Sequence, residues 1–363
     1  MPSPTTRVVI SVQENHTTDN YFRAMAAYGA NVSTGWPTAP NPPAADQPHD
    51  RTAYFKWLTK QITGNHTQFD TAAVIPFYLY LATTGAFLEN HCTGFGTNSS
   101  ANHMLVVGGQ SPTLKNPSFS KPPSWDLPSV PGLAQEHGLS WRCYAGTTKY
   151  PFAFYNELKA SPNIVPSAQF ATDAKAGTLP ALCYLYHDTP LDEHPPADVT
   201  VGHNAMWQAV TALVAAGQWE QTVWMLTWDD WGGYDDHVAT PAVEYTPDNV
   251  QLAYGPRVGL LMFGGRVRRG IDSRWCSHVS LAKTAIQLLG LPPLGVPRVD
   301  QDAGLADLVV AGTSTPPPPA FGTPLRLPPP GPPKPVGPVI LRGGKTLPAP
   351  NDVKLPKQPH PPA

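Results

Sequence analysis

One segment, Thr227-Trp-Asp-Asp-Trp-Gly-Gly-Tyr-Asp-Asp-His-Val238, carries most of the information about both the fold and the function. It contains four aspartates and a histidine within ten residues, directly after the apolar run Thr222-Val-Trp-Met-Leu226. A β-branched and aromatic run of this kind predicts a buried strand, with Asp229 and Asp230 at its carboxyl end. The Gly-Gly pair can turn the chain back toward these acids. Because crowded carboxylates repel one another, the segment predicts either an exposed acidic turn or a site with a compensating positive charge.

Two other strand-like runs end in the same kind of residue. Arg7–Gln13 is followed at once by Glu14, Asn15 and His16. The run 182–186 is followed by a second group of acids and histidines: His187, Asp188, Asp192, Glu193 and His194. If the three strands are parallel neighbours, their carboxyl ends bring these groups to one edge of one sheet. Three such ends together favour a composed metal or phosphate site over an isolated acidic turn.

The rest of the chain alternates strand-like and helix-like patterns. Strands are predicted at 7–13, 139–144, 182–186, 222–228 and 258–263, and helices at 72–84, 129–137, 203–217 and 278–289. This alternation predicts an α/β fold with a mostly parallel central sheet and helices on both faces. We expect one domain over residues 1–312, with loop-rich insertions at 31–70 and 112–128.

Residues 313–363 differ in composition from the rest of the chain. They hold 18 of the 45 prolines, with six Lys or Arg residues and a single acid. The segment lacks apolar periodicity, which predicts an extended, disordered tail. Without it the chain has 18 basic and 25 acidic residues, a formal charge of about −7. An acidic body of this kind makes nucleic acid an unsuitable general partner.

Targeting and redox signals are few. No run of about 18 apolar residues predicts a transmembrane segment. No hydrophobic signal segment precedes the strand at residue 7, so the sequence as written predicts a cytoplasmic protein. The four cysteines are widely separated and form no CxxC pair, so they give no zinc signature and leave their pairing open.

The order of the motifs resembles a bacterial phosphoesterase family of the alkaline phosphatase superfamily, which includes non-zinc phospholipases C and acid phosphatases. The similar segments span roughly residues 7–291: Glu14-Asn-His-Thr-Thr-Asp-Asn-Tyr-Phe22, Asp192-Glu-His-Pro-Pro196, Thr227 through Val238, Gly255-Pro-Arg-Val258 and Ser277-His-Val-Ser280. The resemblance implies an alkaline-phosphatase-like fold and hydrolysis of phosphate esters through a phosphoserine intermediate. It implies as substrate a small phosphate ester or a phospholipid headgroup. Members of the family are often exported.

The resemblance also implies a metal site and a nucleophile. One divalent ion, whether calcium, magnesium or zinc, would be held by four residues: Glu14, Asn15, Asp229 and Asp230. The family nucleophile lies in Gly-Pro-(Ser/Thr)-x-Pro-Asn-(Arg/His), which is similar here to Thr97-Asn-Ser-Ser-Ala-Asn-His103 without the two prolines. This alignment makes Ser99 the nucleophile and leaves Ser100 and Thr97 as alternatives. The missing prolines support a second hypothesis, a catalytically impaired relative that binds a metal or ligand on the same fold.

Histidines in the similar segments would bind the phosphate and move protons. His194 and His237 are the first candidates, followed by His103 beside the nucleophile, while Asn102 would donate an amide hydrogen bond to the phosphate. We expect Asp236 to orient His237, and Asp19 and Tyr21 to hold the loop of Glu14. Other histidines are interpreted as structural: His49, His66, His137 and His203. Nearby aromatic residues are either core or a cage for a quaternary ammonium group: Trp228, Trp231 and Tyr234.

Overall fold

The computed structural model describes residues 7–118, 121–240, 242–245, 251–312 and 315–330. Its centre is an eight-stranded sheet with the strand order β11 (Gly270–Asp272), β2 (Ala86–Leu88), β10 (Leu260–Phe263), β7 (Thr222–Trp228), β1 (Arg7–Gln13), β6 (Leu182–Leu185), β4 (Trp141–Ala145) and β5 (Ile164–Pro166). Strand β10 is antiparallel to both of its neighbours, and the other pairs are parallel. The predicted mostly parallel sheet is therefore confirmed.

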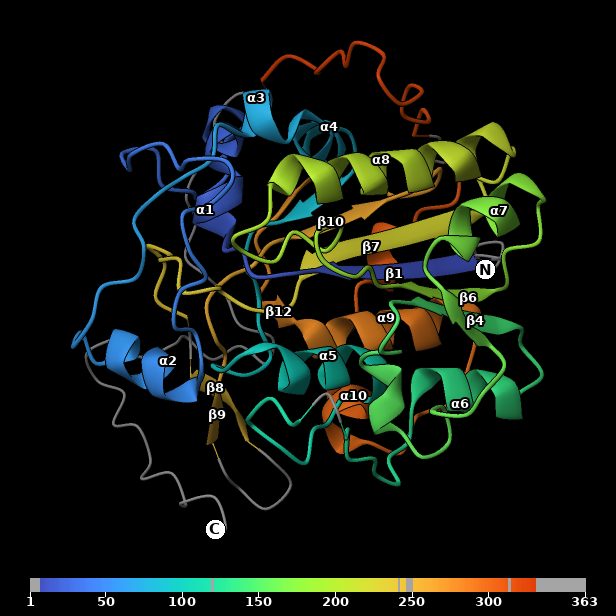
Figure 1. Cartoon of the computed structure of the whole chain (residues 1–363). Coiled ribbons are helices and arrows are strands. Elements are labelled where there is room, and N and C mark those ends of the chain that lie inside the picture. The colour runs from blue at the N-terminus through green and yellow to red at the C-terminus, as the bar shows by residue number, and fades with distance from the viewer. Residues whose placement is uncertain (1–6, 119–120, 241, 246–250, 313–314, 331–363) are drawn as a thin grey trace.

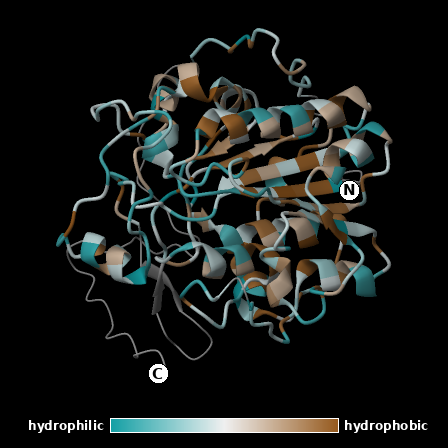
Figure 2. Ribbon diagram, viewed as in Figure 1, coloured by the Kyte–Doolittle hydropathy of each residue, from teal (hydrophilic) through white to brown (hydrophobic). Residues whose placement is uncertain are grey.

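Helices cover both faces of this sheet (Figure 1). One face packs against α4 (Pro76–Thr84), α7 (Gln169–Lys175) and α8 (Val199–Ala215). The other packs against α5 (Ser99–Gly108), α6 (Val130–Glu136) and α9 (His278–Leu289). Strand β1 shows why two cores form, because Val8, Ile10 and Val12 point into one and Val9 into the other. Figure 2 shows the result as hydrophobic central strands flanked by helices of mixed hydropathy.

Shorter elements complete the chain. These are α1 (Thr18–Tyr21), α2 (Arg51–Leu58), α3 (Thr71–Val74), α10 (Pro297–Gln301) and the 3₁₀ turns η1 (Arg23–Tyr28), η2 (Phe152–Phe154) and η3 (Ala306–Leu308). Two small sheets pair β3 (His91–Cys92) with β12 (Cys276–Ser277), and β8 (Ala242–Tyr245) with β9 (Gln251–Ala253). All four cysteines are buried free thiols. Among the described residues, none of the helices has the length and apolar content needed to cross a membrane.

Two predicted helical regions differ from the structure. The helix predicted over 72–84 is two helices, because Pro76 begins α4 and Ile75 between them is non-helical at φ −129°. The polar segment 97–103 contains the start of α5, which the sequence did not predict. Its serines and asparagine suggest a loop, yet every residue of α5 is buried. Burial against α9 and the sheet, rather than local propensity, stabilises this helix.

Part of the predicted disordered tail is ordered. Residues 315–330 pack against α8 and η1, whereas residues 331–363 lie outside the described part of the chain. The indole nitrogens of Trp219 and Trp207 donate to the carbonyls of Thr315 (2.7 Å) and Pro319 (3.2 Å). The Phe321 ring also packs edge-on against Trp207. Proline carbonyls remain free to accept hydrogen bonds, so a proline-rich segment can cover tryptophans without any apolar periodicity.

Candidate active site

The ends of β6, β1 and β7 meet at one edge of the central sheet, as the sequence predicted. Strand β1 lies between the other two and is parallel to both. Hydrogen bonds continue past the strand ends, since the Glu14 amide donates to Asp192 O (2.7 Å) and the Asp229 amide to Gln13 O (2.9 Å). The Asn15 amide donates to Asp229 Oδ1 at 3.0 Å. The residues that follow the three strands are thus tied directly to one another.

Three carboxylates lie around one buried histidine and one serine. His103 Nε2 lies 3.0 Å from Glu14 Oε1 and 3.4 Å from Asp229 Oδ2. The Ser99 hydroxyl lies 3.4 Å from Glu14 Oε2 and 3.3 Å from Asp230 Oδ2. The other oxygen of Asp230 accepts from the Gly232 amide at 2.8 Å, which is the turn that the Gly-Gly pair was expected to make. Groups from residues 14, 99, 103 and 229–230 therefore form one cluster.

The charges in this cluster do not balance within the protein. Burial, and then the negative charge of Asp229, raise the pKa of Glu14 and of Asp230. Burial alone would lower the pKa of His103, but its hydrogen bonds to Asp229 and Glu14 raise it to about 9. One imidazolium thus faces three carboxylates. A bound cation would relieve the repulsion that raises the pKa values of the two acids.

Asn15 gives an independent test of whether these residues fit a cation. One terminal atom of its side chain lies 3.0 Å from Asp229 Oδ1 and 3.2 Å from Glu14 Oε2, and the other lies 3.1 Å from His194 Nε2. If the first atom is nitrogen, it donates to both carboxylates. If it is oxygen, three oxygens face one another, which is favourable only around a cation. Apart from the 3.4 Å contact with His103 Nε2, Asp229 Oδ2 accepts no hydrogen bond from the described residues, so the donor set fits a hard divalent ion.

The three candidate nucleophiles, Ser99, Ser100 and Thr97, have different surroundings. Ser99 begins α5 and is the one whose hydroxyl faces the carboxylates. The Thr97 hydroxyl donates to Leu114 O at 2.7 Å, and Ser100 Oγ accepts from Tyr150 OH at 3.4 Å. Asn102 does not face the site, because its amide bonds the backbone of residues 95, 97 and 98. Asn102 therefore fixes the loop before Ser99.

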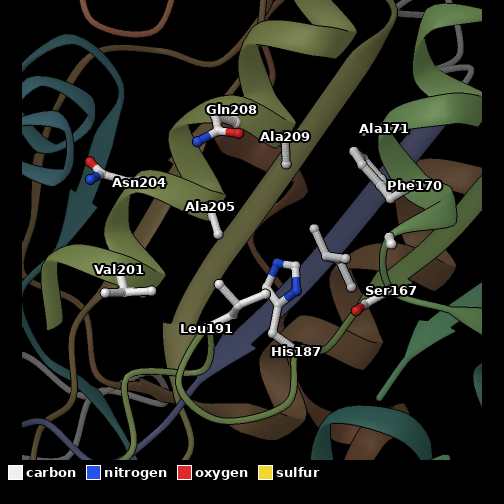
Figure 3. Close-up of a pocket in the computed structure, with 12 residues that line it drawn as sticks. Ser167, Phe170, Ala171, His187, Leu191, Val201, Asn204, Ala205, Gln208 and Ala209 are labelled. Carbon is white, nitrogen blue, oxygen red and sulfur yellow. The ribbon is translucent and has the colours of Figure 1, made fainter. Parts of the chain in front are cut away.

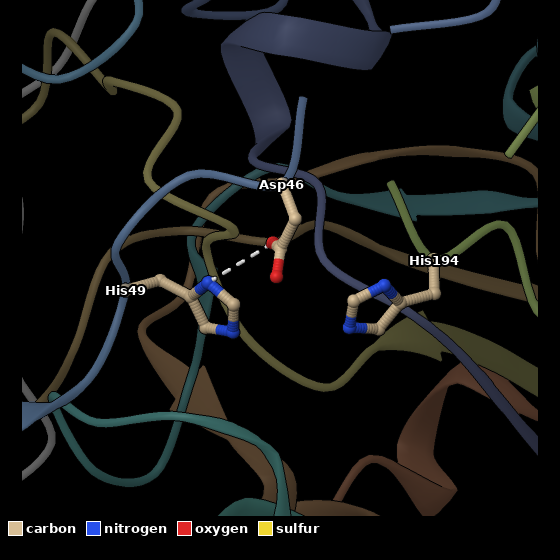
Figure 4. A group of neighbouring side chains, drawn as sticks. All are labelled: Asp46, His49 and His194. Carbon is tan, nitrogen blue, oxygen red and sulfur yellow. Dashed lines mark ion pairs between the residues drawn. The ribbon is translucent and has the colours of Figure 1, made fainter. Parts of the chain in front are cut away.

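Two further histidines, His194 and His49, lie next to the cluster. His194 Nδ1 bonds Pro195 O at 2.7 Å, which leaves Nε2 facing Asn15. His49 Nδ1 bonds Gln47 O at 2.5 Å, and its Nε2 lies 3.8 Å from Asp230 Oδ2. Figure 4 shows the two rings facing each other beside the Asp46 carboxylate. From the sequence, His49 was interpreted as structural, because a single histidine outside the similar segments is more often structural than catalytic.

His237 lies elsewhere. Its Nδ1 bonds Asp19 at 2.6 Å and its Nε2 bonds Asn31 at 3.0 Å, so neither ring nitrogen contacts the four predicted ligands. Asp19, and not Asp236 as predicted, orients this ring. Asp236 instead pairs with Arg257 Nε at 2.8 Å in a fully buried ion pair. The acids after Gly233 therefore hold the loop and do not add to the site.

The aromatic residues near the site are core residues. The three predicted cage residues are at most 1% exposed: Trp228, Trp231 and Tyr234. Trp228 Nε1 donates at 3.0 Å to Glu193, a fully buried carboxylate that also accepts from Gln13, Tyr21 and Tyr78. Tyr21 braces Glu193, and its ring also stacks on that of His16, two residues after Glu14, with 4.0 Å between the ring centroids, so it contacts the loop for which it was predicted.

A cavity of about 220 Å³ opens onto the cluster. It is lined by Glu14, Ser99, Tyr150, His187, Asp192 and His194, among others. Its walls thus include the candidate nucleophile, a candidate metal ligand and a histidine whose Nε2 faces the cluster. This volume accommodates a phosphate group.

A large part of the chain is similar to known phosphoesterases. The model of the phosphoesterase family matches residues 43–292. Non-specific phospholipase C1 of Arabidopsis thaliana is 27% identical over 183 residues, 46% of this chain and 34% of that protein. Phospholipase C A of Mycobacterium tuberculosis is 24% identical over 224 residues, 51% of this chain and 42% of that protein. The matched region thus spans about a third to two-fifths of these relatives' length.

A solved structure shows a similar fold. Murine ectonucleotide pyrophosphatase/phosphodiesterase 5, in complex with AMP, matches with a TM-score of 0.51. The match covers 84% of this chain and 100% of that chain at 12% sequence identity. At such low identity the likeness concerns the architecture of the sheet and its helices alone.

Proposed function

The chain belongs to the phosphoesterase family, and we propose that it hydrolyses phosphate esters with Ser99 as the nucleophile and a divalent cation at Glu14, Asn15, Asp229 and Asp230. The observation that carries this proposal is the convergence of Ser99 Oγ, at 3.3–3.4 Å, on carboxylates that lie 85 and 131 residues away in sequence. The names of the phospholipase C relatives extend the proposal to esters of phospholipid headgroups.

The four oxygen donors fit a hard cation. When bound, such an ion supplies positive charge that stabilises a serine alkoxide and the oxygens of the phosphoryl group. The protein itself contributes the position of Ser99 at the first turn of α5, fixed by Asn102. It also contributes His103, whose positive charge reduces the repulsion between the carboxylates of Glu14 and Asp229.

The proposed reaction has two steps. In the first, Ser99 Oγ forms a bond to phosphorus as the bond from phosphorus to the ester oxygen breaks. The Ser99 proton is within reach of Glu14 Oε2 and Asp230 Oδ2, and the leaving oxygen takes a proton from a histidine. His194 and His49 are the candidates, since each has Nδ1 bonded to a backbone carbonyl and Nε2 directed at the cluster. In the second step water cleaves the phosphoserine and restores the hydroxyl.

Hydrolysis of 4-nitrophenyl phosphate by the purified protein tests this proposal. We expect turnover that chelation abolishes and divalent salt restores. Ser99→Ala should lower kcat by at least about 10³-fold, because no other hydroxyl of the loop faces the carboxylates. Ser100→Ala is the matched control and should retain most of the activity. Equal loss in both variants, or full activity in Ser99→Ala, would remove Ser99 from the mechanism.

The absence of the family's two framing prolines supports a second candidate, a relative that binds a metal or ligand without turnover. This candidate predicts that a divalent ion raises the melting temperature of the protein, while phosphate monoesters and diesters of 4-nitrophenol are not hydrolysed. Detection of a phosphorylated Ser99 by mass spectrometry after acid quenching would exclude it.

A further inference from the structure

A second and larger cavity adjoins the candidate active site. It has a volume of about 410 Å³ and lies between α7, α8 and the end of β6 (Figure 3). Most of its lining is apolar: Phe170, Leu185, Leu191, Val201, Ala205 and Ala209. Its size lies in the range of small-molecule sites, which bind mainly through apolar walls and a few polar groups.

The two cavities share one wall. His187 lines both, and the residues just after it divide between them. Asp188, Thr189 and Asp192 face the smaller cavity, whereas Leu191 faces the larger one. An extended substrate with its phosphate in the smaller cavity would therefore reach the larger one past His187 and the rim of the loop 187–192.

His187 is an unsatisfied polar group at this junction. Neither of its ring nitrogens has a hydrogen-bond partner among the residues that the structure describes, although both are buried. Figure 3 shows the ring projecting into the larger cavity. Burial lowers the pKa of His187 to about 4, so the ring is neutral at pH 7 and offers one donor and one acceptor. An unpartnered buried imidazole of this kind is costly unless a ligand or water satisfies it.

The rim adds a second sign of a binding surface. Leu191 is 36% exposed, one of few large apolar side chains in the described residues with that much contact with water. Opposite it, α8 presents the small side chains of Ala205 and Ala209, which leave the space open. The exposed Leu191 side chain, together with the alanine and phenylalanine side chains that line the cavity, favours an apolar ligand.

We propose that this cavity binds an apolar arm of the phosphate-ester substrate, a hydrocarbon chain or ring attached through the ester to the phosphoryl group at Ser99. His187 would hydrogen-bond a polar atom near the junction of that arm with the phosphate. The proposal rests on the proposed function, because it takes the smaller cavity as the phosphate site. It assigns substrate selectivity to α8 and to the loop 187–192.

Binding of two non-hydrolysable probes tests the cavity independently of turnover. Octyl phosphonate and methyl phosphonate carry the same head, so their dissociation constants, measured by calorimetry on the metal-supplemented protein, isolate the chain. We expect octyl phosphonate to bind at least about tenfold more tightly, since burying only two methylene groups has that effect. The same ratio should appear in kcat/KM for octyl and methyl esters of 4-nitrophenyl phosphate.

Filling the cavity should remove this preference. Ala205→Phe places a ring in the cavity and should bring the octyl-to-methyl ratio close to one while leaving methyl phosphonate affinity unchanged. Ala215→Phe makes the same change at the exposed end of α8, outside the cavity lining, and should keep the ratio. Leu191→Ser, at an exposed position, provides a second variant and should lower the ratio severalfold.

The outcomes separate this proposal from the proposed function. Hydrolysis without chain-length preference, or a preference that Ala205→Phe and Leu191→Ser both retain, would overturn the cavity assignment and leave the phosphoesterase proposal intact. A third outcome is tighter binding of octyl phosphonate than of methyl phosphonate, lost in Ala205→Phe, with no hydrolysis of any ester. This outcome would support the cavity assignment and contradict the phosphoesterase proposal. Equal binding of both phosphonates would overturn the cavity assignment even if esters are hydrolysed.

Discussion

Asp229 and Asp230 stand at the centre of the proposed metal site, and a change of one atom tests them. Asp229→Asn keeps the shape of the side chain but removes a charge from a group of three carboxylates. We expect the dissociation constant for the preferred ion among Mg²⁺, Ca²⁺ and Zn²⁺ to rise at least about tenfold, seen as a smaller rise in melting temperature with added salt. Asp46→Asn is the control, because this side chain is 44% exposed and pairs with His49 rather than with the predicted ligands.

The same experiment tests whether a metal ion or the protein's own charges neutralise the three carboxylates. Unchanged ion affinity in Asp229→Asn would mean that the cluster is balanced by His103 and its neighbours and not by a metal. A loss of affinity in Asp46→Asn as well would extend the site to the group of Asp46, His49 and His194, whose ligand atoms lie within 4.8 Å of one another.

Glu193 gives a prediction of pH dependence. Burial raises the pKa of this carboxyl to about 7, against four hydrogen bonds that lower it. The folded state therefore holds a proton that the unfolded chain has lost between about pH 4.5 and pH 7. Folding stability from this group is present below that window and falls as the pH rises through it, by about 2–3 kcal/mol. Urea unfolding at pH 5 and pH 7.5 should show the fall.

Glu193→Gln should remove most of this fall, because the amide does not ionise while its oxygen still accepts hydrogen bonds. Glu136→Gln, at an exposed helix end, should leave it unchanged. If Glu193→Gln shows the same loss of stability between the two pH values, the carboxyl is already ionised at pH 5 in the folded protein.

Sequence patterns predicted which residues would lie close together where a strand fixes their direction. Glu14, Asn15, Asp229 and Asp230 directly follow β1 and β7, so parallel pairing alone brings them together. His237 lies seven residues beyond Asp230, after the Gly-Gly turn. Nothing in this spacing shows that its imidazole would pair with Asp19 instead of facing the site. His49 was missed for the opposite reason. A long loop carries it to the site, and loop paths have no periodicity to interpret.

Elements with strong local signals were also predictable. The bounds of β1, β7 and α9 match the predicted ranges 7–13, 222–228 and 278–289, since each is a regular apolar pattern with a clear end. Helix α5 and the short strands β2 and β11 were not predicted, because tertiary burial and strand pairing, rather than local sequence, stabilise them. The segment of the proposed nucleophile, Ser99, thus lies where local sequence signals are weak.

Arg257 joins several elements, and its loss should be costly. The guanidinium is fully buried, pairs with Asp236 and Asp19, and also donates to the carbonyls of Asn31 and Glu89. Arg257→Met should lower the free energy of unfolding by about 3–5 kcal/mol, because Asp236 loses the guanidinium that pairs with it in the core and Asp19 loses one of its partners. Arg274→Met removes an arginine that also pairs with two aspartates but is 23% exposed, and should cost about 1 kcal/mol or less. Similar losses in the two variants would contradict a structural role for the buried pair.

The proline-rich segment 315–330 contacts the body of the protein. Truncated chains can separate its contribution to stability from that of the residues after it. This segment supplies carbonyl acceptors to Trp207, Trp219 and Tyr28, so it covers α8 and η1 together. A chain ending at Pro330 should unfold at the same temperature as the full chain. A chain ending at Gly312 should lose about 2 kcal/mol of stability or more, because the hydrogen bonds from Trp207, Trp219 and Tyr28, two made by Thr315, and the ring contact of Phe321 with Trp207 disappear. Tryptophan fluorescence should shift to the red in this shorter chain alone, since Trp207 and Trp219 are 7% and 5% exposed when covered. Equal stability of the two truncated chains would show that the segment lies on the body without stabilising it.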